Sequence, residues 1–132
     1  MSTVSVRYIV DDVDAAIRFY TANLDFKVEL HPAPGFAALR RDDLRLLLNA
    51  PGAGGAGQST AEGAKPAPGG WNRIQIEVDD IQSVCANLQQ QGAAFRNAIV
   101  QGNGGKQALL QDPAGNLIEL FEANSPQRSQ TR

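Results

Sequence analysis

The sequence is poor in the side chains on which many catalytic and metal sites depend. Its 132 residues include one histidine, His31, and one cysteine, Cys85, and only 6% are aromatic. A single cysteine excludes an internal disulfide and fits a reducing compartment, so we expect a cytoplasmic protein. No apolar run approaches the about 20 residues of a membrane span, and Met1–Val4 does not begin a secretion signal, so we expect neither.

The charge balance argues against two classes of partner. Twelve Lys and Arg residues against fourteen Asp and Glu residues give a formal net charge of −2. This charge provides no electrostatic reason to bind nucleic acid or an anionic membrane. The 42% hydrophobic and 20% charged content is typical of a globular protein. At this length we expect one domain, or two small modules that share a core.

An internal repeat is the strongest feature that is present. Residues 6–13 read Val-Arg-Tyr-Ile-Val-Asp-Asp-Val, and residues 74–81 read Ile-Gln-Ile-Glu-Val-Asp-Asp-Ile. Each segment alternates like a strand and then runs into apolar residues at helical spacing. Asp12 and Asp80 are placed to cap the two helices. Gly92 suits the turn that ends the second helix, and Asn23 or Asp25 the turn that ends the first.

Short strands separated by turn residues follow each helix. The candidates are residues 26–30, 36–40 and 44–49 in the first half and 94–99, 106–111 and 117–121 in the second. His31 adjoins Pro32 and is expected in a loop. The predicted organisation is a strand-helix-strand-strand-strand module at 1–50, a flexible Gly/Ala/Pro linker at 51–70, a second module at 71–123 and a disordered tail at 124–132.

This pattern resembles the vicinal oxygen chelate superfamily, which groups glyoxalases, extradiol dioxygenases and bleomycin resistance proteins. The resemblance rests on the two Val-Asp-Asp entries into helices and on the segment Asp112-Pro-Ala-Gly-Asn-Leu-Ile-Glu-Leu. It covers about residues 4–123 and implies an α+β fold. In that fold two βαβββ modules form a cup-shaped mixed β-sheet with the helices outside. It also implies a homodimer.

The positions that carry metal ligands in this superfamily hold other residues here. Metal-using members have a His seven residues before each capping Asp, and a Glu in the last strand of each half. The matching positions are Ser5, Leu47, Arg73 and Glu119. A hydroxyl, an alkyl group and a guanidinium do not replace these ligands. The sequence therefore predicts no bound metal and no cofactor.

Strand alternation indicates which side chains could bind a ligand instead. The predicted ligand-binding set is polar groups beside apolar ones: Arg7, Arg73, Gln75 and Glu119, with Phe36, Leu47, Trp71 and Phe121. Arg73 and Glu119 are expected within reach of one another, either as a structural salt bridge or as part of a ligand site. Trp71 and Phe36 are candidates for stacking, although a lone Trp more often seals a core or an interface. Cys85 is expected to be inert.

Three functional hypotheses remain open. The preferred one is a metal-free binder of a small organic molecule, similar to the antibiotic-sequestering members of the superfamily. The second is an enzyme (lyase, isomerase or dioxygenase), either metal-dependent or using Glu119 as a general base and Arg73 for an oxyanion. The third is an accessory dimer without any ligand.

Overall fold

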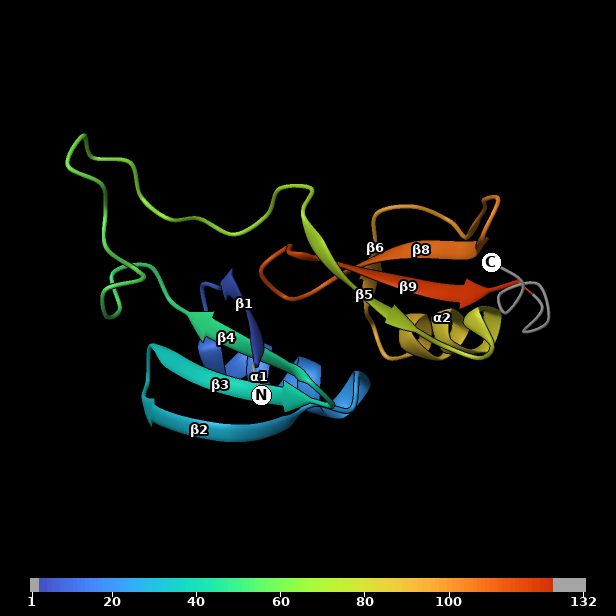
Figure 1. Ribbon diagram of the computed structural model, residues 1–132, viewed down its shortest axis with the longest axis horizontal. Coiled ribbons are helices and arrows are strands. Elements are labelled where there is room, and N and C mark those ends of the chain that lie inside the picture. The colour runs from blue at the N-terminus through green and yellow to red at the C-terminus, as the bar shows by residue number, and fades with distance from the viewer. Residues whose placement is uncertain (1–2, 125–132) are drawn as a thin grey trace. The chain divides into compact units, whose positions relative to one another are not determined.

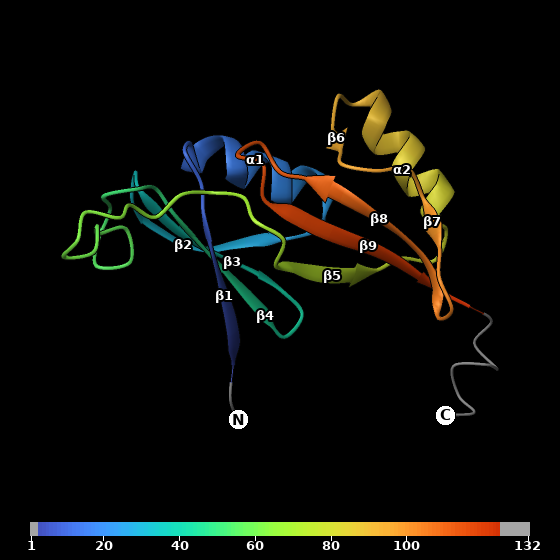
Figure 2. The ribbon, with the colours of Figure 1, turned by 90° about the horizontal axis from the view of Figure 1, so that it is seen from above.

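The computed structural model describes residues 3–124, which divide into two compact units. The first comprises residues 3–70 with 113–116, and the second comprises residues 71–112 with 117–124. In each unit, one helix packs on one face of its own β-sheet (Figures 1 and 2). The predicted α+β class with two modules is therefore confirmed.

The first unit is a four-stranded sheet with one helix. Its elements in chain order are β1 (Val4–Ile9), α1 (Val13–Asn23), β2 (Lys27–Ala33), β3 (Phe36–Arg41) and β4 (Leu44–Asn49). The strand order is β1-β4-β3-β2, in which β1 runs parallel to β4 and the other neighbours are antiparallel.

The second unit repeats this plan with one strand interrupted. Its elements are β5 (Arg73–Glu77), α2 (Ile81–Gln90), β6 (Ala94–Phe95), β7 (Val100–Gln101), β8 (Gly105–Gln111) and β9 (Leu117–Ala123). The order is β5-β9-β8-β6, and β7 also pairs with β8. As in the first unit, the first strand lies parallel to the last.

The predicted turn and cap residues have the expected local geometry. The backbone N–H of Ala15 donates to Asp12 Oδ1, and that of Ser83 donates to Asp80 Oδ1, so both aspartates cap their helices. After α1, Asp25 adopts a left-handed conformation, with φ 61°. After α2, Gly92 does the same, with φ 89°.

Each sheet has one apolar face and one mixed face. Residues at alternate positions of the strands are buried under the helices: Tyr8, Leu39, Leu46 and Leu48 in the first unit, and Ile74, Ile76, Ile118 and Leu120 in the second. Tyr20 of α1 is fully buried, and its ring meets that of Phe26 edge to face at 5.4 Å. The helices therefore cover one face of each sheet, and the polar side chains of the strands alternate onto the other face.

Two of the predicted strand boundaries are wrong. The strand predicted at 26–30 continues to Ala33, so His31 lies in β2 and not in a loop. Register shifts in the β2–β3 pairing allow Pro32 to lie in this edge strand. Of the strand predicted at 94–99, only Ala94–Phe95 forms a strand, β6, and the next strand, β7, begins at Val100. Between them, the side-chain oxygen of Asn97 accepts the N–H of Leu109 at 2.8 Å, a bond that a strand backbone would otherwise make.

Residues 51–70 contain neither helix nor strand, but they do contain hydrogen-bonded turns. Gly52 N donates to Gly57 O at 2.7 Å, and Thr60 N donates to Ala64 O at 2.8 Å. The flexibility of this segment stays a prediction. Of the predicted tail, only Asn124 lies among the described residues, and its side chain donates to Asn103 O at 2.7 Å. Among residues 3–124, no helix has the length and apolar character that a membrane crossing requires.

The cap of α2 gives a test of the local structure. Hydrogen bonds from the Ser83 hydroxyl and backbone lower the pKa of Asp80 below its usual 3.8. A lowered pKa stabilises the folded state above the unfolded pKa, and this contribution is lost as the pH falls through the folded value. We expect Asp80→Ala to lower the urea midpoint at pH 7 and to converge with wild type near pH 2. Asp79→Ala, which removes no cap, is the control; an equal loss in both variants would contradict the assignment.

Candidate functional site

Each unit has one parallel strand pair, and the two pairs place equivalent residues at matching positions on the mixed faces of the sheets. In the first unit, Arg7 of β1 lies opposite Leu47 of β4. In the second unit, Gln75 of β5 lies opposite Glu119 of β9. Leu47 and Glu119 therefore hold the same place in their sheets. One unit has an alkyl side chain where the other has a carboxylate.

Glu119 is the centre of a hydrogen-bonded cluster in the second unit. It is 8% exposed. Arg73 donates to its Oε1 through Nε at 3.0 Å and Nη2 at 2.9 Å, and Gln75 donates to its Oε2 at 2.7 Å. The structure thus brings three of the predicted site residues together. These bonds use three of the about four positions at which a carboxylate accepts.

Trp71 and Arg96 extend this cluster. Arg73 Nη1 donates to the backbone oxygen of Trp71 at 3.1 Å. The indole is 64% exposed, and the Arg96 guanidinium carbon lies 5.0 Å from its ring centroid, a cation–π contact. Trp71 precedes β5 and Arg96 follows β6, which lie at opposite edges of the sheet. The contact therefore reaches across the sheet, and the Arg96 guanidinium lies over one face of the indole.

The first unit has a cavity of about 380 Å³ on its mixed face. Arg7, Phe36 and Asn49 line it, together with the hairpin residues Pro32 and Ala33 and the loop 53–56. Arg7 Nη1 donates to Asn49 Oδ1, which orients the guanidinium. The cavity unites two predicted ligand-binding residues, Arg7 and Phe36.

Three other charged residues of the first sheet form a separate ion-pair group. Glu29 Oε2 accepts from Arg40 Nε at 2.7 Å, and Glu29 Oε1 lies 2.8 Å from Arg45 Nε. The hydrogen bond from Arg40 and the charges of both arginines hold the pKa of Glu29 below its usual 4.5. One carboxylate therefore serves two arginines here.

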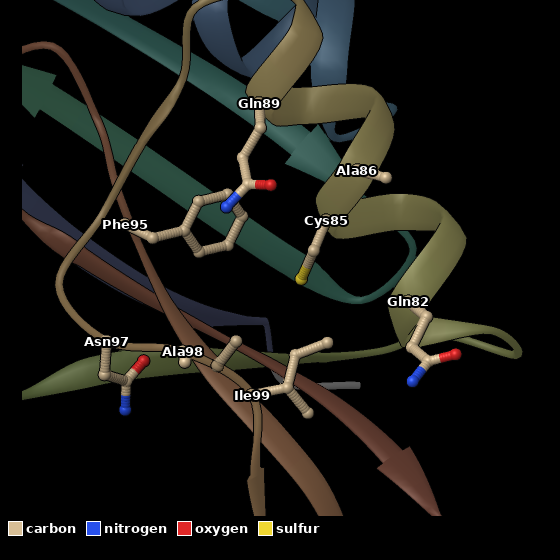
Figure 3. Close-up of a pocket in the computed structure, with 9 residues that line it drawn as sticks. Gln82, Cys85, Ala86, Gln89, Phe95, Asn97, Ala98 and Ile99 are labelled. Atoms are coloured by element: carbon tan, nitrogen blue, oxygen red, sulfur yellow. The ribbon is translucent and has the colours of Figure 1, made fainter.

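A second cavity, of about 410 Å³, lies between α2 and the interrupted strand of the second unit (Figure 3). The thiol of Cys85 and the ring of Phe95 lie at this cavity, and the amides of Gln82, Gln89 and Asn97 stand around it. None of the residues that line it carries a charge. Burial raises the pKa of the Cys85 thiol, which fits the predicted inert role.

The other predicted residues are more scattered. Phe121 is half-buried and lies opposite Glu77, two residue pairs beyond Gln75 and Glu119. Leu47 is half-buried between strands β1 and β3. Sequence reasoning missed Asn49 and Arg96. The alternation of β4 placed Asn49 on the mixed face and could have indicated it, whereas nothing in the sequence pairs Arg96 with Trp71.

Comparisons with known proteins identify the family. Residues 3–120 match the sequence profile of the Glyoxalase/Bleomycin resistance protein/Dioxygenase superfamily. The chain belongs to this superfamily. No curated protein sequence matches the chain.

Solved structures of the superfamily share the fold at low sequence identity. A lactoylglutathione lyase from Agrobacterium tumefaciens has a TM-score of 0.72 and 18% identity, with 92% of each chain covered. TnmS3, an antibiotic binding protein from Streptomyces sp. CB03234, has a TM-score of 0.70 and 23% identity over 94% of this chain and 97% of that one. TioX from Micromonospora sp. ML1 has a TM-score of 0.73 and 17% identity over 94% and 100%. At these identities, the likeness establishes the fold alone.

The metal positions of the superfamily do not fit a metal ion in this member. Ser5 is exposed, Leu47 offers no donor atom, and Arg73 points its guanidinium at Glu119. A cation beside Arg73 would meet like-charge repulsion and would have to compete for oxygens that already accept hydrogen bonds. Across residues 3–124, no three His, Cys, Asp or Glu side chains form a group that could hold an ion.

The Arg73–Glu119 pair can be tested by a double-mutant cycle. Removing one partner leaves a largely buried charge unpaired, so we expect Arg73→Leu to cost about 2 kcal/mol of unfolding free energy, a value reduced for the partial exposure of Arg73. The Arg73→Leu/Glu119→Leu double variant should cost less than the sum of the single ones. Urea unfolding measures all four proteins. Arg40→Leu, in the more exposed pair with Glu29, is the control at about 1 kcal/mol or less; additive losses at Arg73 and Glu119 would contradict the pairing.

The single thiol of this superfamily member provides a probe of the second unit. Because burial raises the pKa of Cys85 and limits access to it, we expect dithionitrobenzoate at pH 8 to react at least about tenfold more slowly with folded than with urea-unfolded protein. Equal rates in the folded and unfolded states would show that the thiol is not buried.

Proposed function

We propose that this protein binds a small organic molecule on the mixed faces of its sheets and needs no metal ion to do so. The proposal rests on the hydrogen bonds that the Glu119 carboxylate accepts. Glu119 is the one carboxylate at the superfamily's ligand positions, and Arg73 and Gln75 bond both of its oxygens. A carboxylate held in this way is a poor metal ligand, and the same cluster offers polar atoms next to the exposed indole of Trp71, a combination that binding sites use.

The first unit adds the space that a ligand needs. Its cavity of about 380 Å³ lies within the range of about 300–1,000 Å³ typical of small-molecule sites. Phe36 supplies an aromatic wall, and Arg7 and Asn49 supply polar atoms. Most of the walls are Ala, Gly and Pro, so apolar contact would provide affinity and the two polar side chains orientation.

The relatives are compatible with binding and with catalysis. TnmS3 is an antibiotic binding protein, which favours a binding role by analogy, whereas the Agrobacterium relative is a lyase. We also propose a cytoplasmic homodimer, on the basis of the superfamily resemblance and the single cysteine.

A metal-free enzyme is the second candidate. Glu119 Oε2 accepts one hydrogen bond among the described residues, from Gln75, so that oxygen retains room for a substrate proton. Arg73 would then stabilise a developing oxyanion. An enzymatic role requires catalytic turnover of a substrate, and the Glu119→Gln variant should lack that turnover.

A thermal-shift screen tests binding directly. Protein dialysed against EDTA is mixed with a library of aromatic and peptide-like natural products, and hits are measured by calorimetry. A ligand at a hundred times its Kd should raise the melting temperature by about 10 °C. Added Zn²⁺, Ni²⁺ or Mn²⁺ should leave the ligand's Kd unchanged. A library without hits, or binding that appears only with metal, would overturn the proposal.

A further inference from the structure

The further inference concerns the charge of the first-unit cavity and rests on the proposed binding function. Arg7 lines this cavity, and none of the other residues that line it is acidic. Among residues 3–124, no carboxylate lies within ion-pair distance of Arg7; its one hydrogen-bond partner there is the neutral side chain of Asn49. No described protein group of opposite charge therefore compensates its positive charge.

The neighbouring arginines differ from Arg7 in this respect. Arg40 and Arg45 share Glu29 on the same sheet. Arg73, on the other unit, is neutralised by Glu119. An oxyanion gains most from the guanidinium that has no carboxylate partner, because it need not displace an existing ion pair.

The guanidinium of Arg7 is also held in place. Asn49 is 3% exposed, accepts from Arg7 through Oδ1, and has its amide nitrogen 3.4 Å from the backbone oxygen of Ala53. Since a guanidinium has five N–H donors and one is used here, others remain for a planar oxyanion. A fixed donor set reduces the entropy lost on binding.

The walls of the cavity suit a small apolar body. The loop that begins at Ala50 folds tightly over the β2–β3 hairpin, because Gly35 and Gly57 have no side chains. A Cβ on Gly35 would lie 2.6 Å from the Cβ of Ala53, and one on Gly57 would lie 2.5 Å from the backbone nitrogen of Ala53. Ala53 to Ala56 thus line the cavity together with Phe36. A volume of about 380 Å³ accommodates a body of one or two rings.

We infer that this cavity selects a small organic anion, in which a carboxylate or a similar planar oxyanion pairs with Arg7 and an apolar ring packs against Phe36. Asn49 is a positioning residue for Arg7. The expected ligand is therefore anionic and small, two properties that the sequence did not specify.

The test compares matched ligands that differ only in charge. Single-ring and two-ring aromatic carboxylates are titrated by calorimetry beside their carboxamides, at 50 mM salt. We expect each carboxylate that binds to do so at least tenfold more tightly than its carboxamide. Arg7→Gln should weaken the carboxylate by ten- to a hundredfold and leave the carboxamide nearly unchanged, which removes the preference. Arg7→Lys should keep part of the preference, because it keeps the charge and loses the planar donor pair.

Two controls separate the charge effect from damage to the fold. Arg40→Gln removes an arginine that is already paired with Glu29, and it should leave the preference intact. Gly57→Val should displace the loop over Phe36 and weaken carboxylate and carboxamide alike, so their ratio stays the same. Circular dichroism and melting temperatures establish that each variant folds.

The outcomes distinguish this inference from the proposed function. Equal affinities for carboxylate and carboxamide, or a preference that survives Arg7→Gln, would overturn the inference and leave metal-free binding standing. The inference is also overturned if the natural-product library yields ligands while no carboxylate of the panel binds. If neither the library nor the panel binds, both the inference and the proposed function fail.

Discussion

The compensation of buried charge is the constraint on which the chemistry of this protein depends. Glu119 lies 8% exposed in the middle strand pair of the second unit, where an unpaired carboxylate would be costly. The parallel register places Gln75 opposite it, and Arg73 reaches it from two residues earlier in the same strand. Because both oxygens are bonded, the carboxylate that the superfamily uses for metals has a different partner here.

The two repeats have the same fold and different electrostatics. At the place of Glu119 the first unit has Leu47, no carboxylate of the described residues pairs with Arg7, and Glu29 already serves Arg40 and Arg45. In the second unit Arg73 is paired with Glu119, and Arg96 stacks on Trp71. The duplicated scaffold therefore offers an anion an arginine without a described carboxylate partner in the first-unit cavity, whereas the arginine beside Glu119 is already paired.

Much of the fold could be predicted from short continuous segments of the sequence. The repeated strand that ends in Val-Asp-Asp predicted both helices and both caps, since capping depends on amides three residues away. The superfamily resemblance gave Arg73 and Glu119 ligand positions of one site, and the structure shows the contact that this implied. The break between β6 and β7 was not predictable from the residue types of this segment. At the break, the side-chain oxygen of Asn97 accepts the N–H of Leu109 in place of a strand's backbone oxygen.

The sequence by itself determined the repeat, the helices, the strand faces and the loss of the superfamily's metal ligands, because each depends on spacing within a short segment or on residue identity. Only the tertiary structure decided that Arg7 meets the neutral side chain of Asn49 and no described carboxylate. That outcome depends on a contact between residues 42 positions apart. Strand register and side-chain reach fix such contacts, and periodicity along the chain does not encode them.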